Sequence, residues 1–457
     1  MHREGTWCKA RGVLQSVVCF VVFPFSVLVW TTIGFGQQSL PNVLVLLADD
    51  LRPDGVAALG NPVLRTPNLD QLVRRGLVFD NAYCFGSNVP AVCLPSRTML
   101  LAGRTYFHYR REELFSLPSL PQSFNQAGYF TYHHGKRGNT PHEIHRHFQE
   151  SRYVKDDEDR RCGEPGKEIV DRAIEYLQNH PTNRPFLMYL AFANPHDPRV
   201  ASQEYRNQYQ HEEIPLPENY LPVHPFDNGG MTVRDERLAP WPRTEEEIRK
   251  HLHDYYAVIT GLDYHIGRLL QFLKEQGLDS NTYIVLTSDN GLAVGSHGLM
   301  GKQSLYEHSM KVPLVIAGPG ISPRRTGALI YLHDLYPTLC DLVGIPVPDG
   351  LDGKSAAGIV RGEKQQHRED LLLCYRDVQR AVRYGRWKLI QYPAIHRTQL
   401  FDVVSDPAER HDLAGDAAQA SRLQELLEWL RRLQKEADDP LPLWAAEKRP
   451  ETFIPPP

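Results

Sequence analysis

Several apolar runs of strand length limit the fold of this chain more than any other feature. They extend over Val43–Ala48, Phe186–Phe192, Tyr283–Thr287 and Val312–Ala317. A strand that is apolar at nearly every position, rather than at every second one, has both faces covered, which is typical of central strands in parallel sheets. The four runs therefore predict a sheet that is buried on both sides.

Segments with helical spacing separate these runs. They cover residues 66–76, 118–128, 169–177, 245–276 and 332–344, and most of them end at a glycine. This alternation of strand and helix predicts an α/β fold whose mainly parallel sheet is sandwiched by helices. A segment without periodicity, Tyr205–Arg243, is predicted to be a long surface excursion that shapes a substrate cleft.

Polar side chains follow the runs at the points where the strands are expected to end. Ligands of open α/β sheets bind beyond the carboxyl ends of the strands, so these side chains are expected to meet at one site. They are Asp49, Asp50, Lys136, His196, Asp289 and Asn290. Adjacent carboxylates such as the first two repel each other unless a cation lies between them, and the oxygen ligands together favour a hard cation.

The segment Cys93–Arg104 is predicted to begin a helix. Pro95 suits the first turn, and Gly103 can adopt the left-handed conformation that ends a helix. Cys93 would then lie beside free backbone N–H groups, with Arg97 one turn further on, in a position that favours anions. The alternative is that Cys93 is an ordinary buried apolar residue.

The order Cys-x-Pro-Ser-Arg from Cys93, with Gly-Arg at the end of the segment, resembles the signature of the type I sulfatases of the alkaline-phosphatase-like superfamily. In that family the cysteine is oxidised after translation to formylglycine, which serves as the nucleophile. The chain has Ala102 where the family usually has threonine. It keeps Cys93, Pro95 and Arg97, which direct the modification.

The resemblance implies hydrolysis of a sulfate ester. Asp49, Asp50, Asp289 and Asn290 would share one cation, Ca²⁺ or alternatively Mg²⁺, with the hydrated aldehyde derived from Cys93. One hydroxyl of that aldehyde hydrate would attack sulfur, and the second would later expel sulfate.

The resemblance also implies roles around the sulfate group. Arg97 would steady the hydrated aldehyde, Lys136 and Lys302 would hold sulfate oxygens, and either His196 or His297 would donate the proton to the leaving group. The spacing between Asp289 and Lys302 looks like that of the iduronate-sulfatase branch, although a lysine after glycine is otherwise often a solvated loop residue.

One position departs from the family pattern. The family commonly reads Gly-Lys-Trp-His, whereas this chain reads Gly135-Lys136-Arg137-Gly138, so the histidine that contacts the sulfate region is absent. Asn139, His142 and His134 are possible substitutes, and the sequence does not choose among them.

The spacing of the apolar runs changes after about residue 352. Short strands at hairpin spacing predict a small antiparallel sheet, followed by a helix over Ala417–Lys435 and a proline-containing tail over Pro440–Pro457. The strands are centred on residues 371–373, 380–383, 387–390 and 399–402. This order also resembles the carboxyl-terminal subdomain of sulfatases. We therefore predict a catalytic domain over residues 37–352 and a subdomain over residues 353–457.

The first residues predict export. Three basic residues precede an apolar run over Val13–Ile33, and small residues before position 37 suit cleavage after Gly36. Residues 1–36 are thus interpreted as a signal peptide of a periplasmic or secreted protein without a membrane span after cleavage, and an uncleaved anchor is the alternative. Removal of the signal leaves five cysteines, and the four other than Cys93 could pair or stay as buried thiols.

The net charge of −4 gives no excess of positive charge of the kind that binds nucleic acid. The expected partners are a sulfated carbohydrate substrate and a formylglycine-generating or sulfatase-maturating enzyme. Two alternatives stay open: a phosphatase or phosphonate/phosphodiester hydrolase on the same scaffold, and an inactive relative that only binds glycans.

Overall fold

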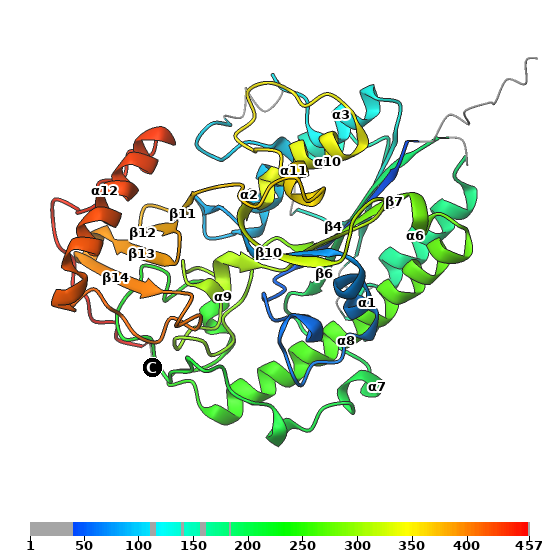
Figure 1. The fold of residues 1–457 in the computed structure, drawn as a ribbon. Helices are drawn as coiled ribbons and strands as arrows, with labels where there is room; N and C mark the ends of the chain where they lie inside the picture. The colour runs from blue at the N-terminus through cyan, green and yellow to red at the C-terminus, as the bar shows by residue number, and fades with distance from the viewer. Residues whose placement is uncertain (1–39, 110–115, 139–140, 156–160, 182–183, 456–457) are drawn as a thin grey trace, which may run out of the picture. The chain divides into compact units, whose positions relative to one another are not determined.

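The computed structural model describes residues 40–109, 116–138, 141–155, 161–181 and 184–455 (Figure 1). The expected signal peptide and Asn139 lie outside the described residues, and the domain boundary near residue 352 stays a prediction. No helix in the described ranges has the length and apolarity needed to cross a membrane. No disulfide joins any two of the five cysteines in these ranges, which are Cys84, Cys93, Cys162, Cys340 and Cys374.

A nine-stranded sheet forms the centre of the structure. Its strand order is β10-β2-β9-β7-β1-β6-β4-β5, and the short β8 pairs with β2. The bounds are β1 Asn42–Asp49, β2 Leu77–Tyr83, β4 Phe130–Lys136, β5 Glu150–Val154, β6 Phe186–Pro195, β7 Thr282–Ser288, β8 Lys311–Val312, β9 Leu314–Ala317 and β10 Arg324–Tyr331. Strands β7, β1, β6, β4 and β5 are neighbours and all parallel, which confirms the predicted fold class.

Alternate residues of β1 belong to two separate cores, as expected for a strand covered on both faces. Val43, Val45 and Leu47 pack in one core, and Leu44 and Leu46 pack in the other. Helices α2 (Cys93–Ala102), α3 (Leu120–Gln126) and α10 (Leu335–Val343) cover one face of the sheet, and α1 (Pro67–Arg75), α6 (Lys167–Asn179) and α8 (Glu245–Glu275) cover the other (Figure 1).

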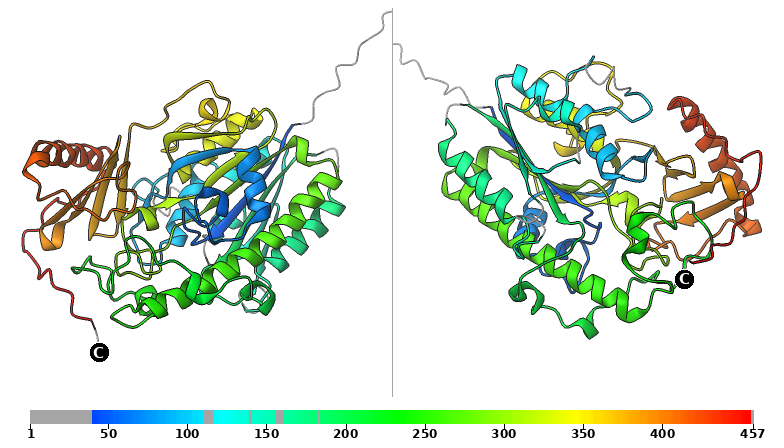
Figure 2. Two further views of the ribbon diagram at one scale, coloured as in Figure 1. Left: turned by 60° about the horizontal axis from the view of Figure 1, so that its bottom comes forward. Right: turned by 180° about the vertical axis from the view of Figure 1, so that it is seen from behind.

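A second sheet contains the carboxyl-terminal strands in the order β14-β13-β12-β11-β3. Their bounds are β11 Asp370–Tyr375, β12 Gln379–Tyr384, β13 Trp387–Tyr392 and β14 Arg397–Asp402, with α12 (Ala420–Glu436) packed beside them (Figure 2). Strand β3 (Gly86–Ser87) comes from the catalytic region and pairs parallel to β11. A Cβ atom at Gly86 would lie 1.8 Å from the Cys374 carbonyl oxygen, so only glycine allows this junction.

The remaining helices are short. They are η1 Ala57–Leu59, α4 His142–His145, α7 Gln203–Arg206, η2 His211–Glu213, η3 Arg234–Leu238, η4 Asp279–Asn281, α9 Glu307–Met310, η5 Leu332–Asp334, α11 Ala357–Val360, η6 Pro393–Ile395 and η7 Ala417–Gln419.

Three local predictions were wrong. The run Val312–Ala317 is not one parallel strand: Pro313, which lacks an N–H donor, separates β8 from β9, and both run antiparallel to their neighbours. The segment Tyr129–Tyr132 predicts a short strand that ends before His133 and His134, but β4 continues to Lys136, so both histidines lie within the strand.

The third wrong prediction concerns Tyr205–Arg243, which is not only a surface excursion. Glu236 and Arg243 are 2% and 0% exposed, and the Arg243 Nη2 group donates to Glu236 Oε2 over 3.0 Å. The same carboxylate accepts hydrogen bonds from the backbone N–H groups of Met300 and Gly301. This buried pair attaches the segment to the loop that carries Lys302.

Candidate active site

The carboxyl ends of four neighbouring parallel strands, β7, β1, β6 and β4, place the candidate residues at one edge of the sheet. Asp49 ends β1 and Asp50 follows it, Lys136 ends β4, His196 follows β6, and Asp289 follows β7. Because the strands are parallel and adjacent, side chains far apart in the sequence meet here. The structure thus brings together candidates from segments separated by up to 240 residues.

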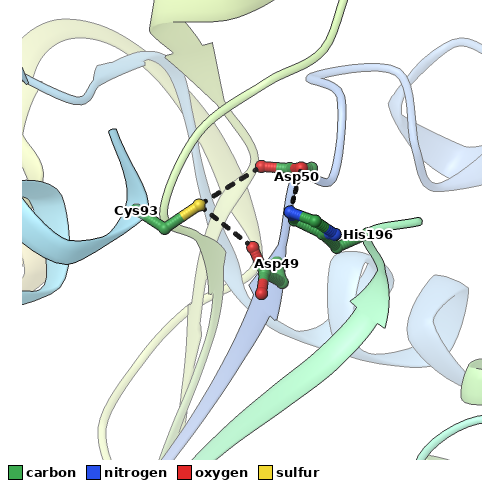
Figure 3. Close-up of side chains that lie close together, drawn as sticks. All are labelled: Asp49, Asp50, Cys93 and His196. Carbon is green, nitrogen blue, oxygen red and sulfur yellow. Dashed lines mark hydrogen bonds and ion pairs between the residues drawn. The ribbon is translucent and has the colours of Figure 1, made fainter. Parts of the chain in front are cut away.

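Cys93, the first residue of α2, points into this cluster. Its Sγ atom lies 3.3 Å from Asp49 Oδ1, 3.8 Å from Asp50 Oδ1 and 3.2 Å from Lys302 Nζ. Figure 3 shows the thiol directed at the two carboxylates, with the His196 ring beside Asp50. Burial, together with the charges of Asp289 and Asp49, raises the pKa of the Cys93 thiol well above its ordinary value. The unmodified side chain is therefore a protonated thiol and a poor nucleophile.

The backbone of Asp50 has the left-handed conformation, with φ at +70°. Successive side chains of a strand normally alternate between its faces, and this local turn lets the carboxylates of Asp49 and Asp50 approach the same thiol. Long-range hydrogen bonds fix the conformation. Asp50 N–H donates to Asp289 Oδ1 over 3.1 Å, and the Tyr255 hydroxyl donates to the Asp50 carbonyl over 2.6 Å.

Three cations surround the three carboxylates. Lys136 Nζ donates to Asp49 Oδ2 over 2.8 Å, Arg97 Nε donates to Asp289 Oδ2 over 2.7 Å, and Lys302 Nζ donates to Asp50 Oδ2. Arg97 Nη2 also lies 3.4 Å from Asp49 Oδ2. Arg97 and the Asp49 and Asp289 carboxylates are completely buried, so these are ion pairs removed from water.

The two adjacent carboxylates differ in pKa, and their oxygens lie among other potential metal ligands. The pKa of Asp49 is well below its ordinary value despite burial, because Lys136 and Arg97 lie beside it. Burial raises the pKa of Asp50 to about 7, and the neighbouring Asp49 and Asp289 carboxylates contribute in spite of Lys302. The side chains of Asp49, Asp50, Cys93 and His196 each offer a ligand atom, and these atoms all lie within 4.8 Å of one another. This donor set fits a metal ion.

Asn290 follows Asp289 in the chain and is 3% exposed. Its Nδ2 atom is buried and has no hydrogen-bond partner in the described ranges. A buried amide without a partner is costly, so this side chain fits a position beside a bound polar group.

The two candidate histidines have different surroundings. His196 Nδ1 donates to the Asp197 carbonyl over 2.6 Å, which leaves Nε2, 3.8 Å from Asp50 Oδ2, facing the cluster. Both ring nitrogens of His297 are engaged elsewhere: Nε2 lies 3.0 Å from the Glu409 carbonyl oxygen, and Nδ1 lies 3.2 Å from Asn219 Nδ2. The ring of His297 stacks on Tyr306. The structure therefore brings His196, and not His297, into contact with the cluster.

None of the described contacts brings a substitute for the missing histidine to the cluster. His134 is buried and pairs with Glu168 of α6 over 2.7 Å, while His142 is exposed on α4. Gly138 has a φ of +85°, a backbone conformation that a histidine would adopt only under strain.

Sequence reasoning missed several polar neighbours of the site. Asp235 Oδ2 lies 4.0 Å from Lys302 Nζ and accepts a hydrogen bond from Gln303 Nε2 over 2.8 Å. Ser96 Oγ donates to the Asp289 carbonyl over 2.7 Å. Asp235 lies in the aperiodic Tyr205–Arg243 segment, where no pattern indicated a functional residue.

Comparison with known families identifies the chain. Residues 41–345 match the family model "Sulfatase", and residues 295–436 match the model "N-sulphoglucosamine sulphohydrolase, C-terminal". The chain belongs to the sulfatase family. The predicted resemblance is therefore confirmed, and the enzyme is a sulfuric ester hydrolase.

Characterised sulfatases align with most of the chain. An N-acetylglucosamine-6-O-sulfatase from Bacteroides thetaiotaomicron is 25% identical, and the alignment covers 88% of each protein. Mouse iduronate 2-sulfatase is 27% identical over 67% of this chain and 69% of its own length. An iduronate 2-sulfatase is thus among the relatives of this sulfatase.

Two solved structures share the fold. A protein in complex with its substrate D-glucosamine-2-N,6-O-disulfate superposes with a TM-score of 0.73 at 22% identity, covering 89% of this chain and 99% of that one. The phosphonate monoester hydrolase of Agrobacterium radiobacter superposes with a TM-score of 0.72 at 22% identity, covering 87% of this chain and 96% of that one. At this identity the likeness shows the fold alone, so it does not distinguish sulfate from phosphonate esters.

Proposed function

We propose that this sulfatase hydrolyses sulfate esters of sulfated carbohydrates and that formylglycine formed from Cys93 is its nucleophile. The observation that carries the proposal is the position of Cys93 Sγ, within 4 Å of Asp49, Asp50 and Lys302 at the start of a buried helix. The carbohydrate substrate is supported by relatives whose names specify sulfated sugars.

We propose further that Asp49, Asp50, Asp289 and Asn290 hold one hard cation together with residue 93. Carboxylate and amide oxygens favour Ca²⁺, with Mg²⁺ as the alternative. When bound, the cation neutralises charge on the sulfuryl oxygens, and the oxidised side chain supplies the attacking oxygen.

The protein's own residues would bind and orient the sulfate group. Lys302 Nζ is 3.2 Å from the side chain of residue 93, so it can reach an anion held there, and Lys136 contacts Asp49 Oδ2, the carboxylate oxygen that the thiol does not contact. Arg97, fixed between Asp289 and Asp49, orients residue 93 from one helical turn away.

His196 is proposed as the proton donor to the leaving alcohol. The expectation from the sequence left His196 and His297 as alternatives. The proposal selects His196 because its Nε2 faces the carboxylate cluster, while both nitrogens of His297 have partners elsewhere. Because Nδ1 already carries a proton, the ring donates from Nε2 as the imidazolium, a form that the bound anionic sulfate group would stabilise. The bond between sulfur and the ester oxygen breaks, the departing oxygen takes the Nε2 proton, and the neutral ring keeps its Nδ1–H.

The nucleophile has to be made before the chain folds. Cys93 and Arg97 are 7% and 1% exposed in the folded protein, so a modifying enzyme cannot reach the motif there. We propose that a formylglycine-generating or sulfatase-maturating enzyme modifies the unfolded chain. Export through the segment 1–36 is part of the same proposal, and amino-terminal sequencing of the protein recovered from producing cells tests it.

Co-expression with a maturating enzyme tests the proposed function. We expect mass spectrometry to find an aldehyde at position 93, and sulfate release from N-acetylglucosamine 6-sulfate that chelation abolishes and Ca²⁺ restores. The matched control is Cys93→Ala. Faster hydrolysis of a phosphonate monoester than of any sulfate ester would favour the phosphonate alternative, and full activity of protein with an intact Cys93 thiol would refute the assigned nucleophile.

A further inference from the structure

Arg199 is a basic side chain near the active site that forms no ion pair with a carboxylate in the described ranges. It lies three residues after His196, on the segment that leaves β6. Four arginines of the surrounding segments do pair with acids: Arg97 with Asp289, Arg52 with Asp54, Arg206 with Asp254, and Arg234 with Asp197 and Asp235. Among the described residues, Arg199 forms no ion pair, and its Nε atom is buried without a hydrogen-bond partner.

Uncharged contacts hold the Arg199 guanidinium in place. The group lies over the Tyr255 ring, 5.3 Å from its centroid, and Nη1 lies 3.4 Å from His251 Nδ1. His251 Nε2 in turn lies 3.2 Å from Glu247. A ring face and an imidazole nitrogen orient the guanidinium without cancelling its charge, and the remaining N–H groups keep their capacity to donate.

Tyr255 connects Arg199 to the catalytic residues. Its hydroxyl donates to the Asp50 carbonyl over 2.6 Å and accepts from Arg52 N–H over 2.9 Å. The charges of Asp50 and Asp235 also act on Arg199, so the guanidinium is within electrostatic range of the residues around the nucleophile. The buried aromatic ring therefore fixes the distance between this positive charge and the site.

The charge of Arg199 has a use if the substrate carries more than one negative charge. Asp50, Asp197 and Asp235 already pair with Lys302 and Arg234, so the guanidinium of Arg199 can attract a second anionic group on a sugar that enters this site. A guanidinium also matches the geometry of carboxylate and sulfate oxygens, to which it can donate two parallel hydrogen bonds.

We propose that Arg199 is a specificity-determining residue that binds a second anionic group, a carboxylate or a further sulfate, on the sugar that carries the scissile sulfate. This inference rests on the proposed function and deepens it by naming the substrate class. Arg199 takes no part in bond breaking, so it contributes to binding and to the choice of substrate.

Binding of matched sugars to the full-length Cys93→Ser protein, in the presence of Ca²⁺, tests the inference without turnover. One pair is D-glucosamine-N,6-disulfate and N-acetylglucosamine 6-sulfate, and the other is 2-sulfated iduronate and its carboxyl methyl ester, which keeps only the sulfate charge. We expect calorimetry to find at least one dianionic sugar bound about 10- to 100-fold more tightly than its partner, the range of a charge-assisted hydrogen bond. A difference within the first pair would indicate recognition of a second sulfate, and a difference within the second pair would indicate recognition of a carboxylate.

Variants then assign the preference to Arg199. Arg199→Gln should remove the preference, and Arg199→Lys should keep part of it because the charge remains. Arg206→Gln, which removes a nearby arginine already neutralised by Asp254, should leave it unchanged. Equal melting temperatures of the variants show that they fold. The inference is overturned if neither pair discriminates in Cys93→Ser, or if the preference survives Arg199→Gln.

Activity measurements separate a failure of the proposed function from a failure of the role assigned to Arg199. Sulfate release by the matured enzyme, together with equal binding of both members of each pair, would leave the proposed function standing and refute the role of Arg199. The absence of sulfate release from all four sugars and from aryl sulfates would refute the proposed function, whatever the binding experiment gives.

Discussion

The Asp50 carboxyl should make the stability of the metal-free protein depend on pH. Its pKa in the folded protein is about 7, against an ordinary value of 3.8, because it is buried beside Asp49 and Asp289. Below pH 3.8 the group is protonated in both the folded and the unfolded state. Between pH 3.8 and 7 the folded state keeps a proton that the unfolded state has lost, so the free energy of unfolding falls as the pH rises.

The size of the effect follows from the pKa difference. Each unit of pKa corresponds to about 1.4 kcal/mol, so the difference amounts to roughly 4 kcal/mol at pH 8 as an upper limit. Asp50→Asn removes the titrating group and keeps an oxygen that can accept from Lys302. In chelator, the variant should therefore gain stability relative to the wild type between pH 5 and 8, by about 1.4 kcal/mol per pH unit at most.

Urea denaturation at a series of pH values measures this difference. Burial also raises the pKa of Glu409 to about 7. Its contribution cancels in the stability difference between the wild type and Asp50→Asn, because both proteins contain Glu409. Saturating Ca²⁺ should remove the Asp50 contribution in the wild type, since a bound cation keeps the carboxylate ionised. Parallel stability curves for chelated wild type and Asp50→Asn from pH 5 to 8 would refute the reasoning.

The remaining predictions concern other residues. His196→Ala should slow hydrolysis of a sugar sulfate by about 10²- to 10³-fold but that of 4-nitrophenyl sulfate by less than about 10-fold, because nitrophenolate leaves without a proton. An equal loss of rate on both substrates would contradict the assignment, and so would the same difference between substrates in His297→Ala. Glu236→Ala should lower the free energy of unfolding by about 3 kcal/mol or more, since it leaves the fully buried Arg243 without its carboxylate partner, and a urea midpoint within error of the wild type would argue against this. Gly86→Ala should destabilise the protein by about 2 kcal/mol or more, as seen in the melting temperature, whereas Gly128→Ala, where φ is also positive but no atom lies within 4 Å of the added Cβ, should cost less. Comparable losses in the two glycine variants would count against a clash with Cys374.

Much of the architecture could be predicted from local patterns. The continuous apolar run of β1 indicated a strand covered on both faces, and its residues do alternate between two cores. The glycine at the end of α2 indicated a left-handed stop, and Gly103 has a φ of +66° with its N–H bonded to the Met99 carbonyl. Strands β5 and β10 were missed because β5 and the first half of β10 are largely polar, as in edge strands with solvent on one side.

The sequence by itself determined which residue types stand at the ends of parallel strands and at the start of α2, because these depend on periodicity and on neighbouring positions. Only the tertiary structure decided which charges neutralise each other. Arg199 and Arg234 look alike in the sequence, but Arg234 pairs with Asp197 and Asp235 while Arg199 lies over Tyr255. Ion pairing depends on distances between side chains from separate segments, and strand order and loop packing set those distances.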